Sequence, residues 1–172
     1  MSARTTADFA ATPAPPDLAG PASGIDPRGP RFAAVLTTTV LALALLLVPG
    51  PVGIALVAAQ GAVFAVGTLL GVAATPYAVL FRAVVRPRLA PPVELEAPQP
   101  PRFAQSVGLV FVVVALVALL AGATLVGQVA LGFALAAAFL NAAFDFCLGC
   151  EMYLLLARLR GARSGVAEGA TP

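Results

Sequence analysis

The sequence contains no histidine, no lysine and no tryptophan, and only two of its 172 residues are cysteines. Without histidine, the Ser/His/Asp and Cys/His nucleophile systems are excluded. A zinc site within one chain would need carboxylates as its remaining ligands, which is an uncommon structural set. Two cysteines cannot build a disulfide framework. No glycine-rich phosphate-binding loop follows a strand pattern.

Charge is also scarce, because only 10% of the residues are charged whereas 60% are hydrophobic. A soluble domain carries roughly 25% charged residues. A water-soluble core could not hide so much apolar surface, so the composition indicates an integral membrane protein whose main partner is the lipid bilayer. The arginines lie at the ends of apolar runs rather than along one stripe, so nothing favours nucleic-acid binding.

Four apolar runs can each cross a bilayer, which requires about 20 residues of helix. Their predicted limits are 32–48, 52–74, 103–121 and 126–147. Tight turns are predicted at 49–51 and 122–125, where proline and glycine end the runs. We therefore predict an all-α membrane domain over residues 30–160 that consists of four transmembrane helices arranged as two tandem helical hairpins. Residues 1–29 and 161–172 are predicted to be disordered tails.

Two further segments flank the predicted spans. Residues 75–89 place apolar side chains at helical spacing, with Arg82 and Arg86 on another face, which is typical of an interfacial amphipathic helix. The proline-rich segment 90–101 is predicted to be an extended loop. The last apolar run continues to Leu159, so it must either extend beyond the membrane or bend, and Gly149 is the predicted position of the bend.

The ten basic residues are distributed asymmetrically. All of them precede the first span, lie between the second and third spans, or follow the fourth, and neither tight turn contains any. The positive-inside rule then places both termini and the middle loop in the cytoplasm. We predict a multi-pass protein of the plasma membrane with this orientation.

The two halves of the chain resemble each other. The segment Pro30–Ala33 recurs as Pro101–Ala104, and the pattern of Tyr77–Arg82 recurs in Tyr153–Arg158. We interpret these matches as an internal repeat with a pseudo-twofold axis along the membrane normal. The repeat pairs Gly71 with Cys147. In the second half, the cysteines would therefore lie at the position that corresponds to the corner after the second span in the first half.

Both cysteines, Cys147 and Cys150, lie in one C-x-x-C motif at the predicted cytoplasmic membrane surface. Residues three apart share a face of a helix, with Cα atoms roughly 5 Å apart, so a reversible disulfide is geometrically possible. In the reducing cytosol the resting form would be the dithiol. A helix that begins just after Cys147 would lower the thiol pKa, whereas a continuous helix near Asp145 and Glu151 would raise it.

Three interpretations of the cysteine pair stay open at this point. The first is a thiol site for redox chemistry or sulfur transfer, with Cys147 as nucleophile and Cys150 as resolving thiol. The second is a metal site, most readily four cysteines shared across a dimer, since one chain supplies only Cys147 and Cys150. The third is a structural role, because free cysteine behaves as a small hydrophobe. No cofactor is predicted.

Four other residues are candidates for supporting roles, namely Asn141, Asp145, Glu151 and Tyr153. Asn141 and Asp145 are four apart and share a helical face. An acid at the end of a span can be functional, but Asp145 could also pair with Arg82 or Arg86 of the middle loop. Asn141 lies deeper and could hydrogen-bond to a neighbouring helix, and the same holds for Gln60, Gln105 and Gln128.

Several short motifs resemble one family. They are 26–33 (DPRGPRFA), Pro76-Tyr77, 85–87 (VRP), 100–105 (PPRFAQ) and 146–153 (FCLGCEMY). In these the chain resembles the actinobacterial branch of the membrane family of domain of unknown function 4395, and Asp145 departs from the small residue expected there. The resemblance implies a polytopic membrane protein without an assigned reaction and a setting of thioredoxin-like and sulfurtransferase proteins.

The leading hypothesis is a four-helix membrane protein whose Cys147/Cys150 pair takes part in thiol redox chemistry or sulfur relay. A non-enzymatic membrane scaffold or anchor for a soluble partner is the alternative from a different class. A subunit of a small permease is a third possibility, and it would need a homo-oligomer to enclose a path.

Overall fold

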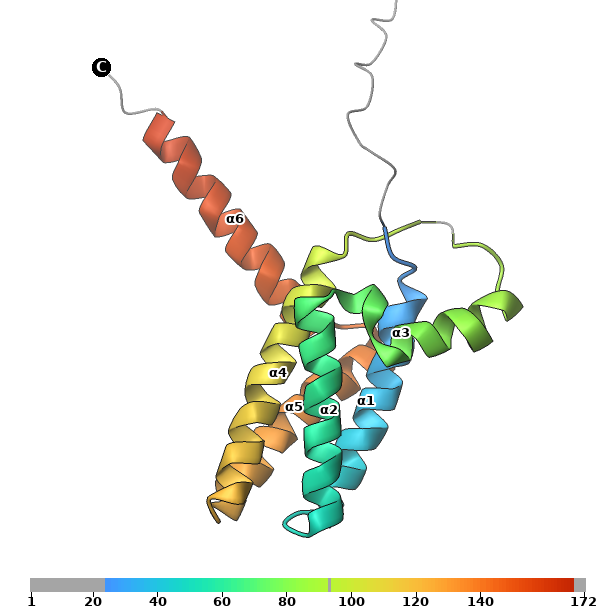
Figure 1. Ribbon diagram of the computed structural model, residues 1–172. Helices are drawn as coiled ribbons and strands as arrows, with labels where there is room; N and C mark the ends of the chain where they lie inside the picture. Colours follow the sequence, from blue (N-terminus) through green and yellow to red (C-terminus); the bar gives the residue numbers. More distant parts are fainter. Residues whose placement is uncertain (1–23, 93, 169–172) are drawn as a thin grey trace, which may run out of the picture.

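The computed structural model describes residues 24–92 and 94–168, and from residue 161 onward only the backbone. Four long helices form the body of the molecule: α1 (Arg28–Leu47), α2 (Pro51–Leu69), α4 (Gln99–Leu120) and α5 (Thr124–Phe144). Each is long and apolar enough to cross a membrane. They form two hairpins, α1–α2 and α4–α5, which pack side by side (Figure 1). The predicted all-α fold of four transmembrane helices is confirmed.

The turns within the hairpins follow from proline and glycine. Helix α1 ends before Pro49, which has no N–H to continue the hydrogen-bond ladder, and Pro51 occupies the first turn of α2. Between α4 and α5 the chain reverses at Gly122, whose φ of 79° lies in the left-handed region that glycine adopts without strain. Both turns lie at the end of the bundle opposite to the start of α1 (Figure 1).

The core of the bundle takes one large, fully buried aliphatic side chain from each long helix. These are Leu41, Val57, Val112 and Leu131, each at most 1% exposed. By contrast, many large apolar side chains point outward along the same helices, for example Leu46 at 80% exposure. A soluble protein rarely exposes so much contiguous apolar surface. Lipid tails would cover these side chains, in agreement with the membrane class indicated by composition.

Each hairpin begins with an arginine that reaches the other hairpin. The Arg102 guanidinium of α4 donates hydrogen bonds to the carbonyl oxygens of Thr68 (2.8 Å) and Leu69 (2.9 Å) at the end of α2. Arg31 of α1 donates one to the carbonyl oxygen of Ala142 near the end of α5 (3.4 Å). The last carbonyls of a helix lack intrahelical partners and carry partial negative charge, so cations are favoured there.

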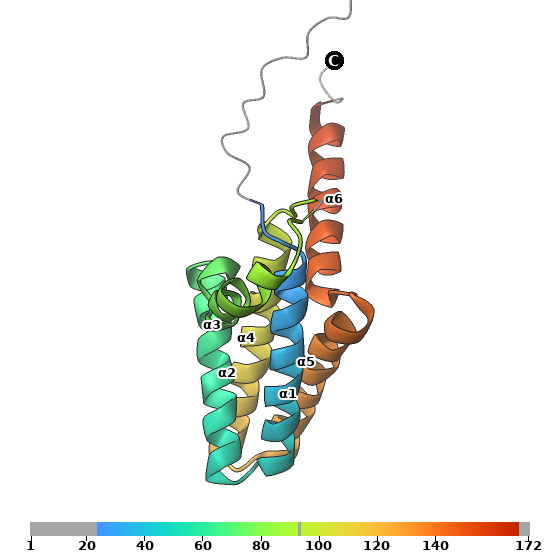
Figure 2. The same ribbon diagram turned by 90° about the vertical axis from the view of Figure 1, so that its right-hand side faces the viewer.

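The segment after α2 is a series of short helical turns. It comprises η1 (Val72–Ala74), α3 (Pro76–Leu80), η2 (Phe81–Val85) and η3 (Arg86–Arg88). From α3 onward it turns away from the long helices and projects sideways past the start of α1 (Figure 1 and Figure 2). Phe81 is buried and stacks on Phe32 of α1 at 5.7 Å between ring centroids. The predicted interfacial amphipathic helix is therefore present, although it is built from short turns.

The observed limits differ from the predicted ones at several places. Helix α4 begins at Gln99 rather than at residue 103, because prolines are tolerated in a first turn whose N–H groups have no partners. The predicted N-terminal tail lies outside the described residues as far as position 23. In the described part of this tail, the backbone of Ile25 pairs with that of Glu96 in an isolated bridge. The second predicted tail, 161–172, is helical through Glu168.

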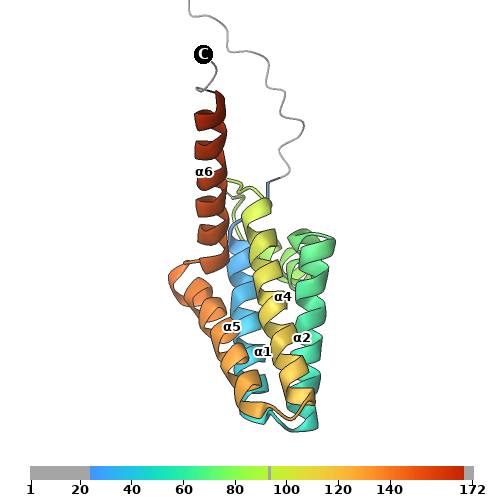
Figure 3. The ribbon, with the colours of Figure 1, turned by 90° about the vertical axis from the view of Figure 1, so that its left-hand side faces the viewer.

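The long apolar run at the C-terminal end of the chain does bend, but not at Gly149. Helix α5 ends at Phe144, and α6 (Leu148–Glu168) starts after a three-residue link and projects beyond the bundle (Figure 1). Along its length α5 diverges from α4, and the link then returns the chain toward the start of α4 (Figure 3). The predicted bend at Gly149 is corrected to Asp145–Cys147, because the left-handed residue is Asp145.

Candidate functional site

Asp145 is the residue that ends α5. It adopts a left-handed conformation with φ of 58°, and its N–H donates to the carbonyl oxygen of Asn141 at 3.1 Å. Aspartate is among the few residues with a side chain that tolerate this region. Its side chain is exposed, and the only ion pair among the described residues joins Arg28 to Asp26. The described part of the chain thus contains no ion pair between Asp145 and Arg82 or Arg86. The backbone of Asp145 ends α5, and the residue also lines the cavity described below.

Cys147 is the capping residue of α6. The N–H of Cys150 donates to Cys147 Sγ at 3.4 Å, and the N–H of Glu151 donates to the carbonyl oxygen of Cys147 at 3.0 Å. This is the arrangement in which a serine or threonine oxygen usually caps a helix, with sulfur in place of the hydroxyl. Of the two backbone conformations considered from the sequence, the helix that begins just after Cys147 is the one observed.

The capping position gives the two thiols opposite acidities. The Cys150 thiol donates a hydrogen bond to Cys147 Sγ, and together with the N–H groups of Cys150 and Gly149 it lowers the pKa of Cys147 to about 7, against the opposing effect of burial. The same hydrogen bond, followed by burial, raises the pKa of Cys150. Cys147 is therefore substantially a thiolate near neutral pH, whereas Cys150 keeps its proton. This asymmetry is required of an attacking and a resolving thiol.

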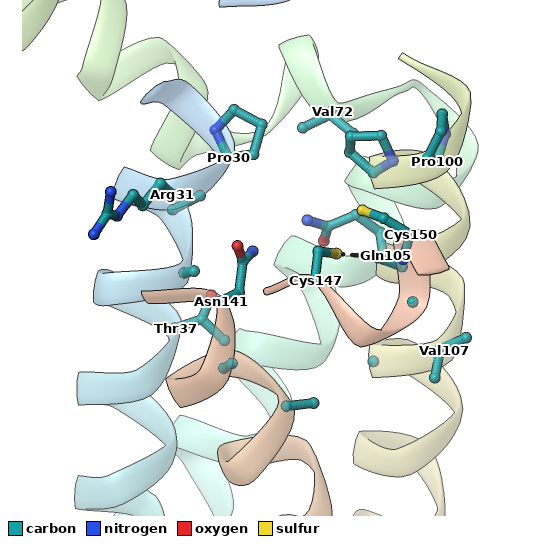
Figure 4. A pocket seen from close by; sticks show the side chains of 18 of the residues that line it. Pro30, Arg31, Thr37, Val72, Pro100, Gln105, Val107, Asn141, Cys147 and Cys150 are labelled. Atoms are coloured by element: carbon teal, nitrogen blue, oxygen red, sulfur yellow. Dashed lines mark hydrogen bonds between the residues drawn. The ribbon is translucent and has the colours of Figure 1, made fainter. Parts of the chain in front are cut away.

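A cavity of about 420 Å³ lies directly beneath the cysteine pair. It occupies the wedge between α5 on one side and α1 and α4 on the other, and the first turn of α6 closes its upper end. Figure 4 shows Cys147 and Cys150 beside each other at this end, and the Asn141 side chain points up from α5 to the level of Cys147. Both cysteines are partly exposed, so a reactant in the cavity can reach them.

Small side chains create this cavity. Ala134, Ala137 and Ala138 form a stripe at helical spacing on α5, and they face Ala34 of α1 and Gly108 of α4 across the space. Side chains this short cannot fill the wedge that opens as α5 diverges. The sequence contained this signal, but without the tilt of α5 an alanine stripe indicates close helix packing instead.

Few polar groups reach the interior of the cavity. Gln105 of α4 lines it, and its Oε1 atom is buried without a hydrogen-bond partner among the described residues. Asn141 of α5 also lines it and makes no side-chain hydrogen bond to another described residue. The expected bond from Asn141 to a neighbouring helix is thus absent. Gln105, considered from the sequence only as a helix-packing residue, contributes to the site.

Gly149 and Tyr153 hold α6 against α4. A Cβ atom on Gly149 would lie 2.6 Å from both Cα and Cβ of Ala104, so only glycine permits this approach. The Tyr153 ring packs on Phe103 at 5.9 Å between centroids and does not line the cavity. Glu151 stands at the rim of the cavity with its side chain exposed, and it opposes the lowering of the Cys147 pKa. Tyr153 therefore positions the site, whereas Glu151 belongs to its opening.

A metal centre within one chain finds no support. Within the described part of the chain, no three His, Cys, Asp or Glu side chains are grouped closely enough to hold an ion. The alternative in which Cys147 and Cys150 share a metal across a dimer stays a prediction.

Comparison with known proteins identifies a family but no activity. No curated protein matches the chain, and no solved structure matches it either. The family described as Domain of unknown function (DUF4395) matches residues 25–158, which include all four long helices, the cysteine pair and Tyr153. The chain therefore belongs to the DUF4395 family.

Proposed function

We propose that this membrane protein carries a reversible dithiol/disulfide site formed by Cys147 and Cys150. The observation that carries the proposal is the cap of α6, where the Cys147 sulfur accepts the N–H of Cys150 at 3.4 Å and the neighbouring Cys150 thiol helps to lower the pKa of Cys147. A structural cysteine gains nothing from this position, because a hydroxyl caps a helix better than sulfur does. A thiolate nucleophile does gain from it, since the free N–H groups stabilise its charge.

The reaction follows from the two acidities. The Cys147 thiolate attacks one sulfur of a partner disulfide, so a mixed disulfide forms and the other partner sulfur leaves as a thiolate. Cys150 then loses its proton and attacks Cys147 Sγ, which forms the Cys147–Cys150 disulfide and releases the second partner thiolate. The partner gains two electrons and the pair loses two, and the reverse sequence reduces the pair. In sulfur transfer, the Cys147 thiolate attacks the outer sulfur of a partner persulfide, so that Cys147 becomes the persulfide and the partner leaves as a thiolate.

The proposed location is the cytoplasmic face of the plasma membrane. The arginines support it, because Arg28, Arg31 and Arg102 all belong to the first turns of α1 and α4, whereas the turns at the opposite end contain none. Under the positive-inside rule the end with the cysteines faces the cytoplasm, together with both termini. Thioredoxin-like or sulfurtransferase proteins, implied by the family resemblance, are the proposed partners, and a homo-oligomer is compatible with the lipid-facing surface.

We also propose that the two hairpins are an internal repeat. Arg31 and Arg102 occupy matching positions in the sequence, and each one contacts the end of the second helix of the other hairpin. Reciprocal contacts of this kind are expected of two units related by a pseudo-twofold axis.

The test is a pH profile of thiol alkylation on the full-length protein in lipid nanodiscs. For Cys147, reaction with iodoacetamide should increase with pH and reach half of its maximal rate near pH 7, because the thiolate is the nucleophile. In Cys150→Ala the midpoint should move up toward the usual thiol value of about 8.5, because the hydrogen bond is lost. Cys147→Ser controls for labelling of Cys150, which should be slow at neutral pH. A Cys147 midpoint unchanged by Cys150→Ala would contradict the proposal.

The lowered pKa of Cys147 should also make the stability of the folded protein increase with pH. The pKa of Cys147 is lower in the folded protein than in the unfolded chain, so the folded state favours the thiolate. The stabilisation is therefore fully present above about pH 8.5 and is lost as the pH falls through about 7. Thermal unfolding of the reduced protein should show this trend, and Cys147→Ser should abolish it.

A membrane anchor for a soluble partner is a second candidate, favoured by α6. This helix projects beyond the bundle with several exposed leucines, namely Leu154, Leu155, Leu156 and Leu159. If anchoring were the function, Cys147→Ser and Cys150→Ser variants would support normal physiology, whereas a chain ending before Leu154 would not.

A further inference from the structure

The cavity beneath the cysteines raises the question of what enters it. A dithiol needs an electron acceptor, and this cavity connects the thiols with the membrane-spanning part of the protein. Its lining extends to Phe64 of α2, Phe111 of α4 and Ala134 of α5, all well inside candidate spans. Its volume of about 420 Å³ lies within the range of about 300–1,000 Å³ that is typical of small-molecule sites.

We propose that this cavity binds the ring of a membrane quinone and that Cys147 and Cys150 exchange two electrons with it. The inference rests on the proposed dithiol function and adds a substrate class to it. Such a ligand is flat, uncharged and lipid-soluble, and it carries two carbonyl oxygens that become hydroxyls on reduction.

The walls of the cavity fit a neutral ring. Apolar side chains, mostly of alanine and proline, form the larger part of them, and the charged residues of the lining, Arg31, Glu96, Asp145 and Glu151, are all exposed at the cytoplasmic end. A charged, water-soluble disulfide would need charged partners in the interior, because an unpaired buried charge is costly. The described lining offers none there, so the interior favours an uncharged ligand.

The two interior amides supply the polar contacts that such a ring needs. Gln105 Oε1 has no hydrogen-bond partner among the described residues and lies against Gly67 of α2, so a ligand hydroxyl in the cavity reaches it after a rotation of the amide and then removes the cost of the missing bond. A hydroquinone hydroxyl is a donor of this kind, and the amide NH₂ of Gln105 or Asn141 can donate to a quinone carbonyl. The Asn141 amide lies beside Cys147 (Figure 4), so a ring that is hydrogen-bonded to this amide would lie next to the thiolate.

The electron and proton balance is complete with the quinone as oxidant. The Cys147 thiolate forms a bond to a ring carbon, and Cys150, after losing its proton, attacks Cys147 Sγ. The S–S bond forms while the S–C bond breaks, and its electron pair stays on the ring. Two thiols thus become one disulfide, and the quinone takes up two electrons and two protons to become a hydroquinone. Reduction of the pair by a hydroquinone is the same sequence reversed.

The experiment uses the reduced full-length protein in nanodiscs under anaerobic conditions. The probe is a ubiquinone analogue with a short saturated tail, whose ring carbons are all substituted so that free thiols do not arylate it. Quinone absorbance should fall by one equivalent per protein while both thiols disappear. Cys147→Ser should remove the reaction.

Substitutions in the cavity test quinone binding independently of the thiol chemistry. Ala138 lines the cavity, so Ala138→Leu should lower the rate at low quinone concentration by at least about tenfold. Ala136→Leu is the matched control, because Ala136 lies on the same helix with its side chain exposed. Gln105→Leu should raise the half-saturating quinone concentration about fivefold to tenfold, as expected for one hydrogen bond. If Ala138→Leu also impaired folding, Gln105→Leu would still test the site.

A water-soluble disulfide provides the reference reaction. If the pair reacts with it in every cavity variant but reduces no quinone, or if Ala138→Leu and Gln105→Leu leave quinone reduction unchanged, the quinone site is refuted and the dithiol stands. If the pair forms no disulfide with either oxidant, the proposed function itself fails.

Discussion

The corner after α2 and the corner after α5 solve the same structural problem with different chemistry. Each one leaves a span through a residue with positive φ, Gly71 at 96° and Asp145 at 58°. Each one then starts a new helix with a side-chain cap, since Thr75 Oγ1 accepts the N–H of Ala78 at 3.2 Å and Cys147 Sγ accepts that of Cys150 at 3.4 Å. Cys147 thus has the capping position at its corner that Thr75 has at the other corner, whereas the proposed sequence repeat pairs Cys147 with Gly71.

The capping side chains Thr75 and Cys147 differ in how far they are buried. Thr75 is 1% exposed, and its hydroxyl also donates to the carbonyl oxygen of Val72 at 2.8 Å, so every polar atom is satisfied. Cys147 is only partly buried and borders the cavity. A threonine would meet the structural need at both corners. The thiol therefore adds reactivity where a ligand has access.

Replacing the thiol cap by a hydroxyl cap should have the largest effect. Cys147→Thr keeps a side-chain acceptor for the N–H of Cys150, so the free energy of unfolding should stay within about 1 kcal/mol of the parent value. Disulfide formation should be lost completely, because no nucleophile remains. Thermal unfolding and a count of reactive thiols after oxidation measure the two effects. A loss of fold in Cys147→Thr would mean that the thiol itself is structural.

Adding one methyl group at Gly149 should be the next largest perturbation. Its Cβ would lie 2.6 Å from the backbone of Ala104, so Gly149→Ala must displace the start of α6. Overpacking of this kind typically costs about 1–3 kcal/mol. Displacement of α6 should also raise the midpoint of Cys147 alkylation. The matched control is Gly132→Ala on α5, where a Cβ meets open space. Equal stability of both variants would show that α6 is not anchored through Gly149.

Removing the cap at the other corner should have a smaller effect that is confined to stability. Thr75→Ala leaves the N–H of Ala78 without its acceptor, which typically costs about 1 kcal/mol. The disulfide chemistry of Cys147 should be unchanged, because α3 does not contribute to the cavity. Stability and disulfide formation should be measured in both Thr75→Ala and Cys147→Thr, because each variant should change only one of the two. Altered thiol reactivity in Thr75→Ala would show that the corner after α2 also influences the cysteine site.

How much the sequence could predict depends on the length scale of each interaction. The four spans and their hairpin turns were predictable, because apolar run length and proline or glycine position act locally. Cys147 and Cys150 were identifiable as candidates, but their acidity was not, since it depends on where α6 begins. The sequence favours Gly149 as the position of the bend because glycine breaks helices. In the structure, glycine is instead required at this position because α6 packs closely on Ala104, which is a tertiary contact that the local sequence does not reveal. The cavity and the role of Gln105 depend on the tilt of α5, which no local pattern encodes.

The smallest effect is expected where the two corners bend. A residue with a Cβ in the left-handed region is strained by roughly 1–2 kcal/mol, and aspartate less than most. Asp145→Gly should therefore change the free energy of unfolding by less than about 1 kcal/mol, because relief of strain is offset by greater freedom of the unfolded chain. The reciprocal change Gly71→Ala should destabilise by about 1 kcal/mol, although nothing lies within 4 Å of the new Cβ. Chemical denaturation of both variants measures the difference. If Asp145→Gly instead abolished thiol reactivity, the carboxylate of Asp145 would have a part in the chemistry that its backbone role does not require.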